Sequence, residues 1–475
     1  MFVGIDVGTS MVKAAAFDRT GRQLGVEARA VGYGVRHGAV EQDMRAVYAA
    51  VVGVLRELTG RLEEPVELAG LTGQGDGVWL VDAAGRQVRP ALSWMDGRAH
   101  ELVDQWMADG TFETVFRRTG SAMFPGCPGP LLAWLDRHEP ASLDRAAAAV
   151  FCKDMVFQRL TAAERAVTDV SDASMPFLDP RTRRYDNGVV ELLGLTHRRR
   201  LLPPVGDPIA TGEASGVGLP AGTPLANGPY DLPACALGAG VTAPGDGLLI
   251  VGTCLASLVA TAELDLSGEP AGLYISTDRP GHWLRAMPAM VGTAALDWVL
   301  ATTGARHDEL DALLAEAPPG ASGVRVLPYL APSGERAPFV EPGLRAELLG
   351  VSLETRPAHL VRATCEGIGY AARHCIQAAG LTGTLAVCGG GTRSPAWTQL
   401  LADVLGRPLR VVEGEVGARG AVLAAAERYG VPLDSAAWTE PTRVIEPAPD
   451  RAAFYTKGYD EHLELLARAR RRARR

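Results

Sequence analysis

The feature that most constrains the fold is a pair of matching hairpins, one at the start of the chain and one near its middle. In residues 2–17 an apolar strand reaches Asp6, turns through Gly8-Thr9-Ser10 and returns as a second apolar strand. Residues 248–264 repeat the order strand, Val-Gly-Thr, small residues, strand. Two such hairpins predict two related lobes that face one cleft.

The first turn carries groups that suit phosphate oxygens. Gly8 allows a close approach of the backbone, Thr9 and Ser10 add N–H and hydroxyl donors, and Lys13 adds positive charge. Asp6 is placed to hold a divalent cation through water. A turn in which the Asp and Thr side chains only satisfy local backbone groups fits this short string equally well, and the second hairpin favours the phosphate interpretation.

Length and composition narrow the class of protein. At 475 residues the chain predicts two or three domains, and its hydrophobic fraction of 47% is that of a globular protein. A net charge of −8 gives no bulk attraction for nucleic acid. Seven Cys residues without a Cys-x-x-Cys pair indicate a reducing cytoplasm, and no apolar stretch approaches the length of a membrane span.

The segments after the first hairpin alternate between helix and strand. Apolar residues recur at helical spacing from Met44 to Leu58, and residues 65–72 form a short apolar strand. This alternation predicts a layered α/β fold. A long helix is expected from about Pro357 to Ala379.

Two strand ends in the first half carry side chains that suit a polyhydroxylated ligand. The first is the glycine-rich loop 73–77, with Gln74 and Asp76. The second places an aromatic, an acid and a base together: Trp94, Asp96 and Arg98. Amide and carboxylate groups bond to hydroxyls while Trp covers a carbon face. A glycine-rich turn capped by Asp76 is the alternative for the first loop.

Two further motifs precede helices. Asp231 stands at the start of a small-residue helix just before the second hairpin, where it is either a functional carboxylate or an ordinary N-cap. In the last third, a strand meets Gly389-Gly390-Gly391 and then a helix with Ser394 as the expected N-cap and Pro395 in its first turn. A bare glycine turn suits a flat adenine and an α-phosphate.

With these hairpins and the glycine run, the chain resembles the FGGY family of carbohydrate kinases, within the actin-like ATPase superfamily. The resemblance runs from the first strand to about Tyr429. It implies an α/β, two-lobed actin-like ATPase (ribonuclease H-like) fold of duplicated domains with a central cleft. Residues 1–240 would form the N-terminal, sugar-binding lobe, and residues 241–475 the C-terminal, ATP-binding lobe.

The resemblance also implies roles for individual residues. Asp231 matches the catalytic base, and Asp6 with Asp231 would serve a magnesium ion. Substrate contacts fall on Gln74, Asp76, Trp94, Asp96, Arg98 and Asp231. ATP contacts fall on Gly8, Thr9, Ser10, Lys13, Gly252, Thr253, Gly292, Gly389, Gly390, Gly391 and Ser394. The segment Gly334-Glu335-Arg336-Ala337-Pro338 matches a signature loop of the family whose chemistry stays open.

The implied function is transfer of phosphate from Mg-ATP to a terminal hydroxyl of a small sugar or polyol. The form Gly73-Gln74-Gly75-Asp76-Gly77 resembles erythritol or L-xylulose kinases, whereas many xylulokinases have Gln-Met-His at this loop. D-xylulose is therefore the alternative acceptor. A non-catalytic sugar sensor or a chaperone-like ATPase on the same scaffold is the alternative of another class. Relatives are often homodimers and cytoplasmic, and no nucleic-acid or membrane partner is expected.

Overall fold

The chain, described here as a computed structural model over residues 1–211 and 218–474, divides into two compact units. Unit 1 consists of residues 1–240, 262–284 and 414–440, and unit 2 of residues 241–261, 285–413 and 441–475. The sequence predicted two uninterrupted lobes, 1–240 and 241–475. The structure differs because two later segments, 262–284 and 414–440, pack with the first.

Unit 1 is built on a sheet whose centre is the predicted N-terminal hairpin. Strands β1 and β2 pair antiparallel from Phe2 opposite Phe17 to Val7 opposite Val12, and β1 pairs parallel with β6. The strand order is β12 (Ile209–Thr211), β13 (Pro224–Asn227), β6 (Leu68–Gly73), β1 (Phe2–Val7), β2 (Met11–Phe17) and β3 (Gln23–Ala30). The three central strands β13, β6 and β1 run parallel, and both edges are antiparallel.

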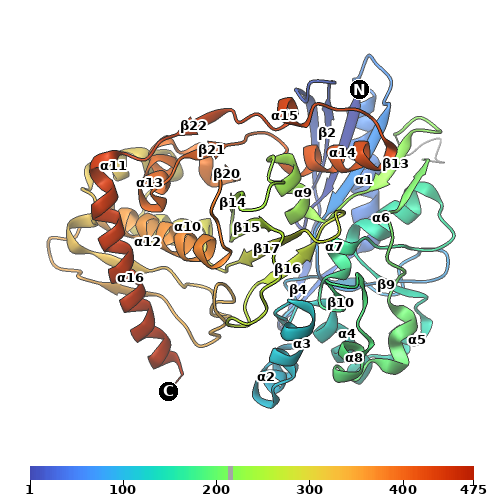
Figure 1. The fold of residues 1–475 in the computed structure, drawn as a ribbon, viewed down its shortest axis with the longest axis horizontal. Helices are drawn as coiled ribbons and strands as arrows, with labels where there is room; N and C mark the ends of the chain where they lie inside the picture. Colours follow the sequence, from blue (N-terminus) through green and yellow to red (C-terminus); the bar gives the residue numbers. More distant parts are fainter. Residues whose placement is uncertain (212–217, 475) are drawn as a thin grey trace. The chain divides into compact units, whose positions relative to one another are not determined.

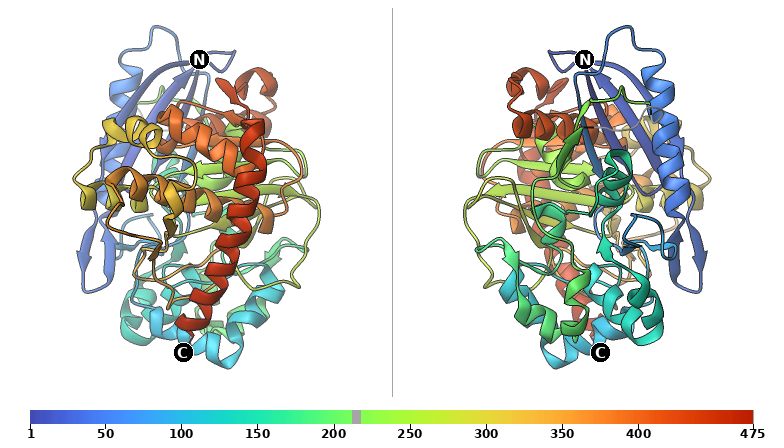
Figure 2. Two further views of the ribbon diagram at one scale, coloured as in Figure 1. Left: turned by 90° about the vertical axis from the view of Figure 1, so that its left-hand side faces the viewer. Right: turned by 90° about the vertical axis from the view of Figure 1, so that its right-hand side faces the viewer.

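The two faces of this sheet are covered by helices from opposite ends of the chain. Val3, Ile5 and Val7 of β1 belong to one buried cluster with α1 (Met44–Thr59), and Figure 2 shows α1 lying along these strands. Phe2 packs on the other face with α14 (Val416–Tyr429), which Figure 1 shows in red beside the blue strands. Successive side chains of a strand point to opposite faces of the sheet, and both faces of β1 are buried.

Helix α14 lies so close to the sheet that two strand positions require glycine. A Cβ at Gly4 would stand 2.1 Å from the carbonyl oxygen of Ala418, and one at Gly70 would stand 2.1 Å from that of Ala421. Real Cβ atoms never approach so closely, so any larger residue would force the helix off the sheet. This packing is the reason that residues 414–440 belong to unit 1.

The remaining elements of unit 1 are short strands, most of them paired in sheets of two or three, and a helical region. The strands are β4 (Gly34–Arg36), β5 (Ala39–Gln42), β7 (Trp79–Val81), β8 (Ala91–Leu92), β9 (Ala148–Val150), β10 (Leu178–Asp179), β11 (Arg184–Tyr185) and β16 (Leu273–Ser276). The helices are α2 (His100–Asp109), α3 (Thr111–Thr119), α4 (Pro128–His138), α5 (Pro140–Arg145), α6 (Cys152–Thr161), α7 (Val170–Ala173), α8 (Asn187–Leu192), η1 (Thr196–Leu201), α9 (Asp231–Gly238) and α15 (Ser435–Trp438).

Unit 2 repeats the topology of the first sheet around the second hairpin. Its strands follow the order β17 (Trp283–Pro288), β15 (Leu255–Thr261), β14 (Gly247–Val251), β20 (Leu385–Cys388), β21 (Leu409–Val411) and β22 (Arg443–Ile445). Strands β14, β20 and β21 are parallel, while β15 and β22 pair antiparallel with their neighbours. The duplication predicted from the two hairpins is therefore confirmed at the level of the whole sheet.

The other elements of unit 2 surround this sheet. They are α10 (Thr293–Thr303), η2 (His307–Glu309), α11 (Leu310–Glu316), η3 (Ala321–Gly323), β18 (Arg325–Leu327), β19 (Glu347–Leu349), α12 (Pro357–Ala378), η4 (Gly390–Arg393), α13 (Pro395–Leu405), η5 (Pro449–Arg451) and α16 (Ala452–Ala473). One buried cluster joins the sheet to α10, α12, α13 and α16, and Figure 2 shows α16 as a single long helix. Within the described residues, every helix is too short or too polar to cross a membrane.

Candidate active site

The first turn of unit 1 brings its predicted charged residues together. Asp6 and Lys13 face each other across the β1–β2 pair. Lys13 also forms an ion pair with Glu415, with 2.9 Å between Nζ and Oε2. Glu415 is the residue just before α14, and its carboxylate already neutralises the Lys13 ammonium group. Lys13 would therefore meet a phosphate with its charge partly compensated. No sequence signal joins residues so far apart.

The Thr9 hydroxyl is engaged by the two substrate loops. It donates to Gln74 Oε1 at 3.1 Å and accepts from Trp94 Nε1 at 2.8 Å. Gln42 Nε2 binds the Thr9 carbonyl at 2.8 Å. The one proton of this hydroxyl is directed to Gln74, so its donation to a phosphate stays a prediction and would require a change of partner. Thr9 would offer a phosphate its backbone N–H, while exposed Ser10 is better placed to offer a hydroxyl.

The loop at the end of β6 lies against the segment that carries Asp231. Gln74 donates its backbone N–H to Val7 at 2.9 Å, which ties the loop to the end of β1. A Cβ at Gly75 would meet the Tyr230 ring at 2.6 Å, so only glycine permits this contact. Asp76 follows with φ of 56°, a left-handed conformation that costs free energy for a non-glycine residue.

Asp231 occupies the first position of α9 and is partly exposed. Burial and the nearby Asp6 and Asp76 carboxyls raise its pKa to about 8, against the opposing effect of the Leu232 N–H. Burial also raises the pKa of Asp6 to about 6, Lys13 opposing and Glu415 adding to the shift. One oxygen of Asp6 is buried without a hydrogen-bond partner among the described residues. Carboxyls that lie close together and have raised pKa values are typical of catalytic and cation sites.

The backbone just before Asp231 is held by a buried ionic network that sequence reasoning missed. Lys153 lies 3.2 Å from Asp154, 3.1 Å from Asp169 and 2.9 Å from Asp172, and all four side chains are essentially inaccessible. Burial alone would lower the pKa of Lys153, but the three carboxylates raise it above its ordinary value.

This network reaches the Asp231 segment through two hydrogen bonds. Asn227 Nδ2 donates to Asp154 at 2.7 Å. Ser171 Oγ donates to Asp169 at 2.6 Å and accepts from the Tyr230 N–H at 3.1 Å. The network therefore fixes the backbone that leads to Asp231. The dipeptide Lys153-Asp154 at a helix start was the one signal that could have revealed it.

Asp96 and Arg98 bind each other rather than standing open. Arg98 Nη2 lies 2.8 Å from Asp96 Oδ2 and 2.9 Å from Glu41 Oε1, and its guanidinium stacks over the Trp134 ring at 4.8 Å. Asp96 is 1% exposed and also accepts from the Val40 N–H. Asp96 thus shapes the loop and positions Arg98, which keeps some exposed surface.

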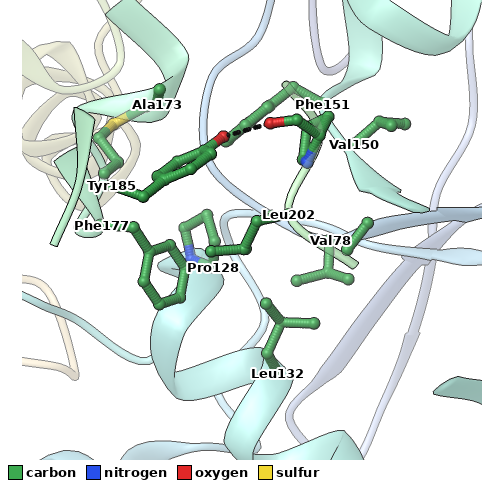
Figure 3. Close-up of a pocket in the computed structure, with 13 residues that line it drawn as sticks. Val78, Pro128, Leu132, Val150, Phe151, Ala173, Phe177, Tyr185 and Leu202 are labelled. Carbon is green, nitrogen blue, oxygen red and sulfur yellow. Dashed lines mark hydrogen bonds between the residues drawn. The ribbon is translucent and has the colours of Figure 1, made fainter. Parts of the chain in front are cut away.

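A small cavity lies behind the loop at residues 73–77. Apolar side chains line it, and Tyr185 points across it to donate a hydrogen bond of 2.9 Å to the Pro203 carbonyl (Figure 3). Its volume of about 10 Å³ is near the minimum for one water molecule. This cavity is a packing defect of the core and is too small and too apolar for a polyol.

Unit 2 contains a much larger pocket at its own hairpin turn. Its volume is about 660 Å³, within the range of small-molecule sites. Five of the predicted nucleotide residues line it: Gly252, Thr253, Gly390, Gly391 and Ser394. Leu296, Leu310 and Trp397 supply apolar walls. The second turn and the glycine run, far apart in sequence, thus meet in one concave site.

The three glycines of the run have different reasons to be glycine. Gly389 has φ of 101°, a region that disfavours side chains, and lies against the Val251 backbone. A Cβ at Gly391 would meet Val251 Cγ1 at 2.3 Å. Around Gly390 a Cβ would find open space, with no described atom within 4 Å. Gly390 is therefore the position at which bare backbone faces the pocket.

The pocket also contains polar side chains that sequence reasoning did not select. Asp297 and His307 are 3.0 Å apart, and Ser394 donates its hydroxyl to Asp311. Ser394 caps α13 by accepting from the Trp397 N–H at 3.0 Å, as predicted. These acidic groups line a wall where hydroxyl or amine donors of a ligand can bind. Isolated Asp residues on helices gave no motif to find them by.

Gly292 lies beside the pocket rather than in its lining. A Cβ there would stand 2.4 Å from the Thr253 carbonyl oxygen, so the residue allows the start of α10 to pack on the turn.

Within residues 1–211 and 218–474, no group of three or more His, Cys, Asp or Glu side chains is arranged to hold a metal ion. Asp6 and Asp231 are two carboxylates, a number that suits magnesium bound mainly by water and phosphate.

The chain matches one protein family over most of its length. The sequence model described as the FGGY family of carbohydrate kinases, N-terminal domain, matches residues 1–238, and the corresponding C-terminal domain matches residues 247–428. An erythritol kinase of Brucella abortus is 35% identical, over 99% of this chain and 96% of its own length. A probable L-xylulose kinase of Pasteurella multocida is 27% identical, over 98% of each.

A solved structure agrees with these matches. The crystal structure of xylulose kinase from Rhodospirillum rubrum superposes with a TM-score of 0.88 at 28% identity, covering 100% of this chain and 99% of that one. The duplicated ribonuclease H-like topology described above is thus shared along the whole chain.

Proposed function

This chain belongs to the FGGY family of carbohydrate kinases, and from that premise we propose that its acceptor is a small polyol or ketose, erythritol before L-xylulose. It is an ATP-dependent kinase of the actin-like ATPase fold. The preference for erythritol is supported by the 35% identity to the erythritol kinase, against 27% to the probable L-xylulose kinase. The loop Gly73-Gln74-Gly75-Asp76-Gly77 supports either of these two acceptors over D-xylulose.

The observation that carries the proposal is the Asp231 carboxyl. It is partly exposed, its pKa is raised to about 8, and the loop with Gln74 and Asp76 lies against the residue before it. A base with a pKa near the working pH is the efficient acceptor for a hydroxyl proton. The side chains around it are those that a polyol would bond to.

The residues of unit 1 would have different roles in the reaction. Gln74, Asp76, Trp94 and Arg98 bind and orient the acceptor. The Asp231 carboxylate accepts the proton of a terminal hydroxyl through Oδ and holds the oxygen for attack on the γ-phosphate. The buried Lys153 network keeps the backbone before Asp231 in place. Lobe movement that excludes water would prevent hydrolysis from competing.

Magnesium is proposed as the accompanying cation. Asp6, with one buried oxygen lacking a partner among the described residues, and Asp231 would hold it together with phosphate oxygens and water. When bound, it would neutralise phosphate charge, and it would lower the raised pKa values of both carboxyls. The residues fit this role because a bound cation would stabilise the charged form of each carboxyl, which burial disfavours.

In unit 2 the nucleotide is proposed to occupy the pocket of about 660 Å³. The adenosine would lie on Gly390 against Leu296, Leu310 and Trp397, and the phosphates on the backbone of Gly252 and Thr253. Gly8, Ser10 and the Thr9 N–H of unit 1 are proposed as further phosphate contacts. A homodimer is also proposed, and sedimentation velocity checks it.

The test is ADP release from Mg-ATP against a panel of acceptors: erythritol, L-xylulose, D-xylulose, D-ribulose, xylitol, L-arabinitol and glycerol. Turnover far above background with erythritol supports the proposal, and the highest kcat/KM with D-xylulose would replace it by a xylulokinase. A flat panel with ATP bound would favour a sensor or a chaperone-like ATPase. The kinase names of the relatives reported above do not favour those two alternatives.

A further inference from the structure

The signature loop at residues 334–338 lies beside the turn at residues 252–254, both in unit 2. Its second residue, Glu335, is 2% exposed. One carboxylate oxygen accepts backbone N–H bonds from Met290 at 2.7 Å, Arg336 at 2.8 Å and Ala337 at 3.3 Å. The other accepts from Val291 at 3.3 Å. A buried carboxylate with four backbone donors is an anchor for two chain segments.

The segment that Glu335 anchors is in turn bonded along the phosphate turn. Leu255 donates to the Val291 carbonyl at 2.7 Å and accepts from the Ala289 N–H at 2.9 Å. Thr293 donates to the Gly252 carbonyl at 2.8 Å, and Ala294 to the Thr253 carbonyl at 3.2 Å. These bonds hold the turn's carbonyl oxygens toward the start of α10.

Two other features of the same loop reinforce the anchor. Arg336 Nε donates to the Pro288 carbonyl at 3.0 Å, so the loop holds the segment 288–294 at its first residue as well. Gly334 has φ of 74°, and a Cβ there would stand 2.3 Å from the Glu341 carbonyl oxygen. The loop can therefore place Glu335 inside the unit only with glycine before it.

We propose that Glu335 is a positioning residue for the nucleotide: it fixes segment 288–294, and through this segment it fixes the Gly252-Thr253-Cys254 turn. The proposal rests on the proposed function of that turn as a phosphate site. A turn whose carbonyls repelled the phosphates would bind ATP poorly, so the anchor supports affinity for ATP without touching it. Burial raises the pKa of Glu335 and its four N–H donors oppose the shift.

The test compares Glu335→Gln with a matched control, Glu366→Gln. Glu366 is a buried carboxylate of the same unit, 3% exposed, that accepts from Gly320 N at 2.9 Å, Arg362 Nε at 3.0 Å and the Tyr455 hydroxyl at 3.2 Å. Glu335→Gln should raise the KM and Kd for ATP about tenfold, the equivalent of one lost charged hydrogen bond. The acceptor KM should stay unchanged. Glu366→Gln should lower Tm and leave both constants unchanged.

Equal ATP affinity of folded Glu335→Gln and Glu366→Gln would overturn the proposal and leave the kinase assignment intact. Wild-type protein that fails to bind ATP at all would overturn both. A measurement on the wild type covers the case in which Glu335→Gln does not fold. In amide hydrogen exchange, ATP should protect residues 288–294 together with 252–255, and protection confined to 252–255 would contradict the coupling.

Discussion

The two hairpins are built on one plan but carry different chemistry. In β1–β2 the last paired residues are Val7 and Val12, with residues 8–11 between them, whereas in β14–β15 they are Val251 and Leu255, with residues 252–254 between them. One position before the last pair, the first hairpin has Asp6 opposite Lys13. The second has Ile250 opposite Ala256 at that register.

Duplication of the scaffold has therefore not duplicated its charges. The first turn has an acid, a cation and a hydroxyl that is engaged by Gln74 and Trp94. The second has no charged side chain among residues 252–254, and the buried Glu335 carboxylate supports its backbone through the segment 288–294. We interpret the first as the turn that takes part in the chemistry and the second as a cradle for the nucleotide.

The largest effect is expected for Asp231→Asn. Turnover should fall by about 10³-fold, because the amide cannot accept the hydroxyl proton. The Kd for ATP and the acceptor should change little, since shape is conserved. Steady-state kinetics and isothermal titration measure both quantities. Near wild-type turnover with intact binding would remove Asp231 from the role of base.

The comparison between hairpins is tested by a pair of substitutions at matching positions. Asp6→Asn should lower kcat by about a hundredfold, because it removes the charge that would face the cation. Ile250→Val should leave kcat unchanged and lower the free energy of unfolding by about 1 kcal/mol. If both variants kept wild-type kcat, the charge difference between the hairpins would have no catalytic meaning.

The two turn threonines should separate the two substrates. Thr9→Val removes the hydroxyl shared by Gln74 and Trp94, so the acceptor KM should rise about tenfold, with less effect on ATP. Thr253→Val should raise the KM for ATP by a smaller factor and leave the acceptor KM unchanged, because Thr253 is exposed in the nucleotide pocket. The opposite pattern would exchange the assignments of the turns.

The smallest effect concerns stability and pH. The ordinary pKa of an Asp carboxyl is 3.8, and in the folded protein the pKa of Asp231 is about 8. Between these values the folded state therefore binds more proton at Asp231 than the unfolded state does, and the contribution of Asp231 to stability falls as pH rises through this window. Asp231→Asn lacks this pH-dependent contribution. The Tm of the variant should therefore exceed that of the wild type by an amount that grows from pH 4 to pH 8 and reaches a few degrees. A constant difference in scanning calorimetry across these pH values would show that the pKa is not raised.

The sequence predicted the parts of the molecule that depend on local pattern. The alternation Phe2, Val3, Ile5 dictates a two-faced strand, and both hairpins, the helix at Met44 and the capped helix after Ser394 are confirmed. Glycine patterns also pointed to real close approaches, as at Gly75 and Gly391.

What the sequence could not supply was the partner of each polar group. Lys13 pairs with Glu415, and Thr9 binds Trp94, across separations that only the folded sheet creates. For the same reason residues 414–440 return to unit 1, because the packing of Ala418 on Gly4 leaves no local trace. Local spacing indicates which residues matter, and tertiary contacts decide which role each one has.

Phosphorus NMR of the wild-type enzyme incubated with Mg-ATP and erythritol tests the proposed phosphate transfer at its product. Transfer to the acceptor should give a new phosphomonoester signal that grows in step with ADP, with little inorganic phosphate. ADP accompanied by inorganic phosphate alone, with no ester on erythritol or on any other acceptor of the panel, would contradict it.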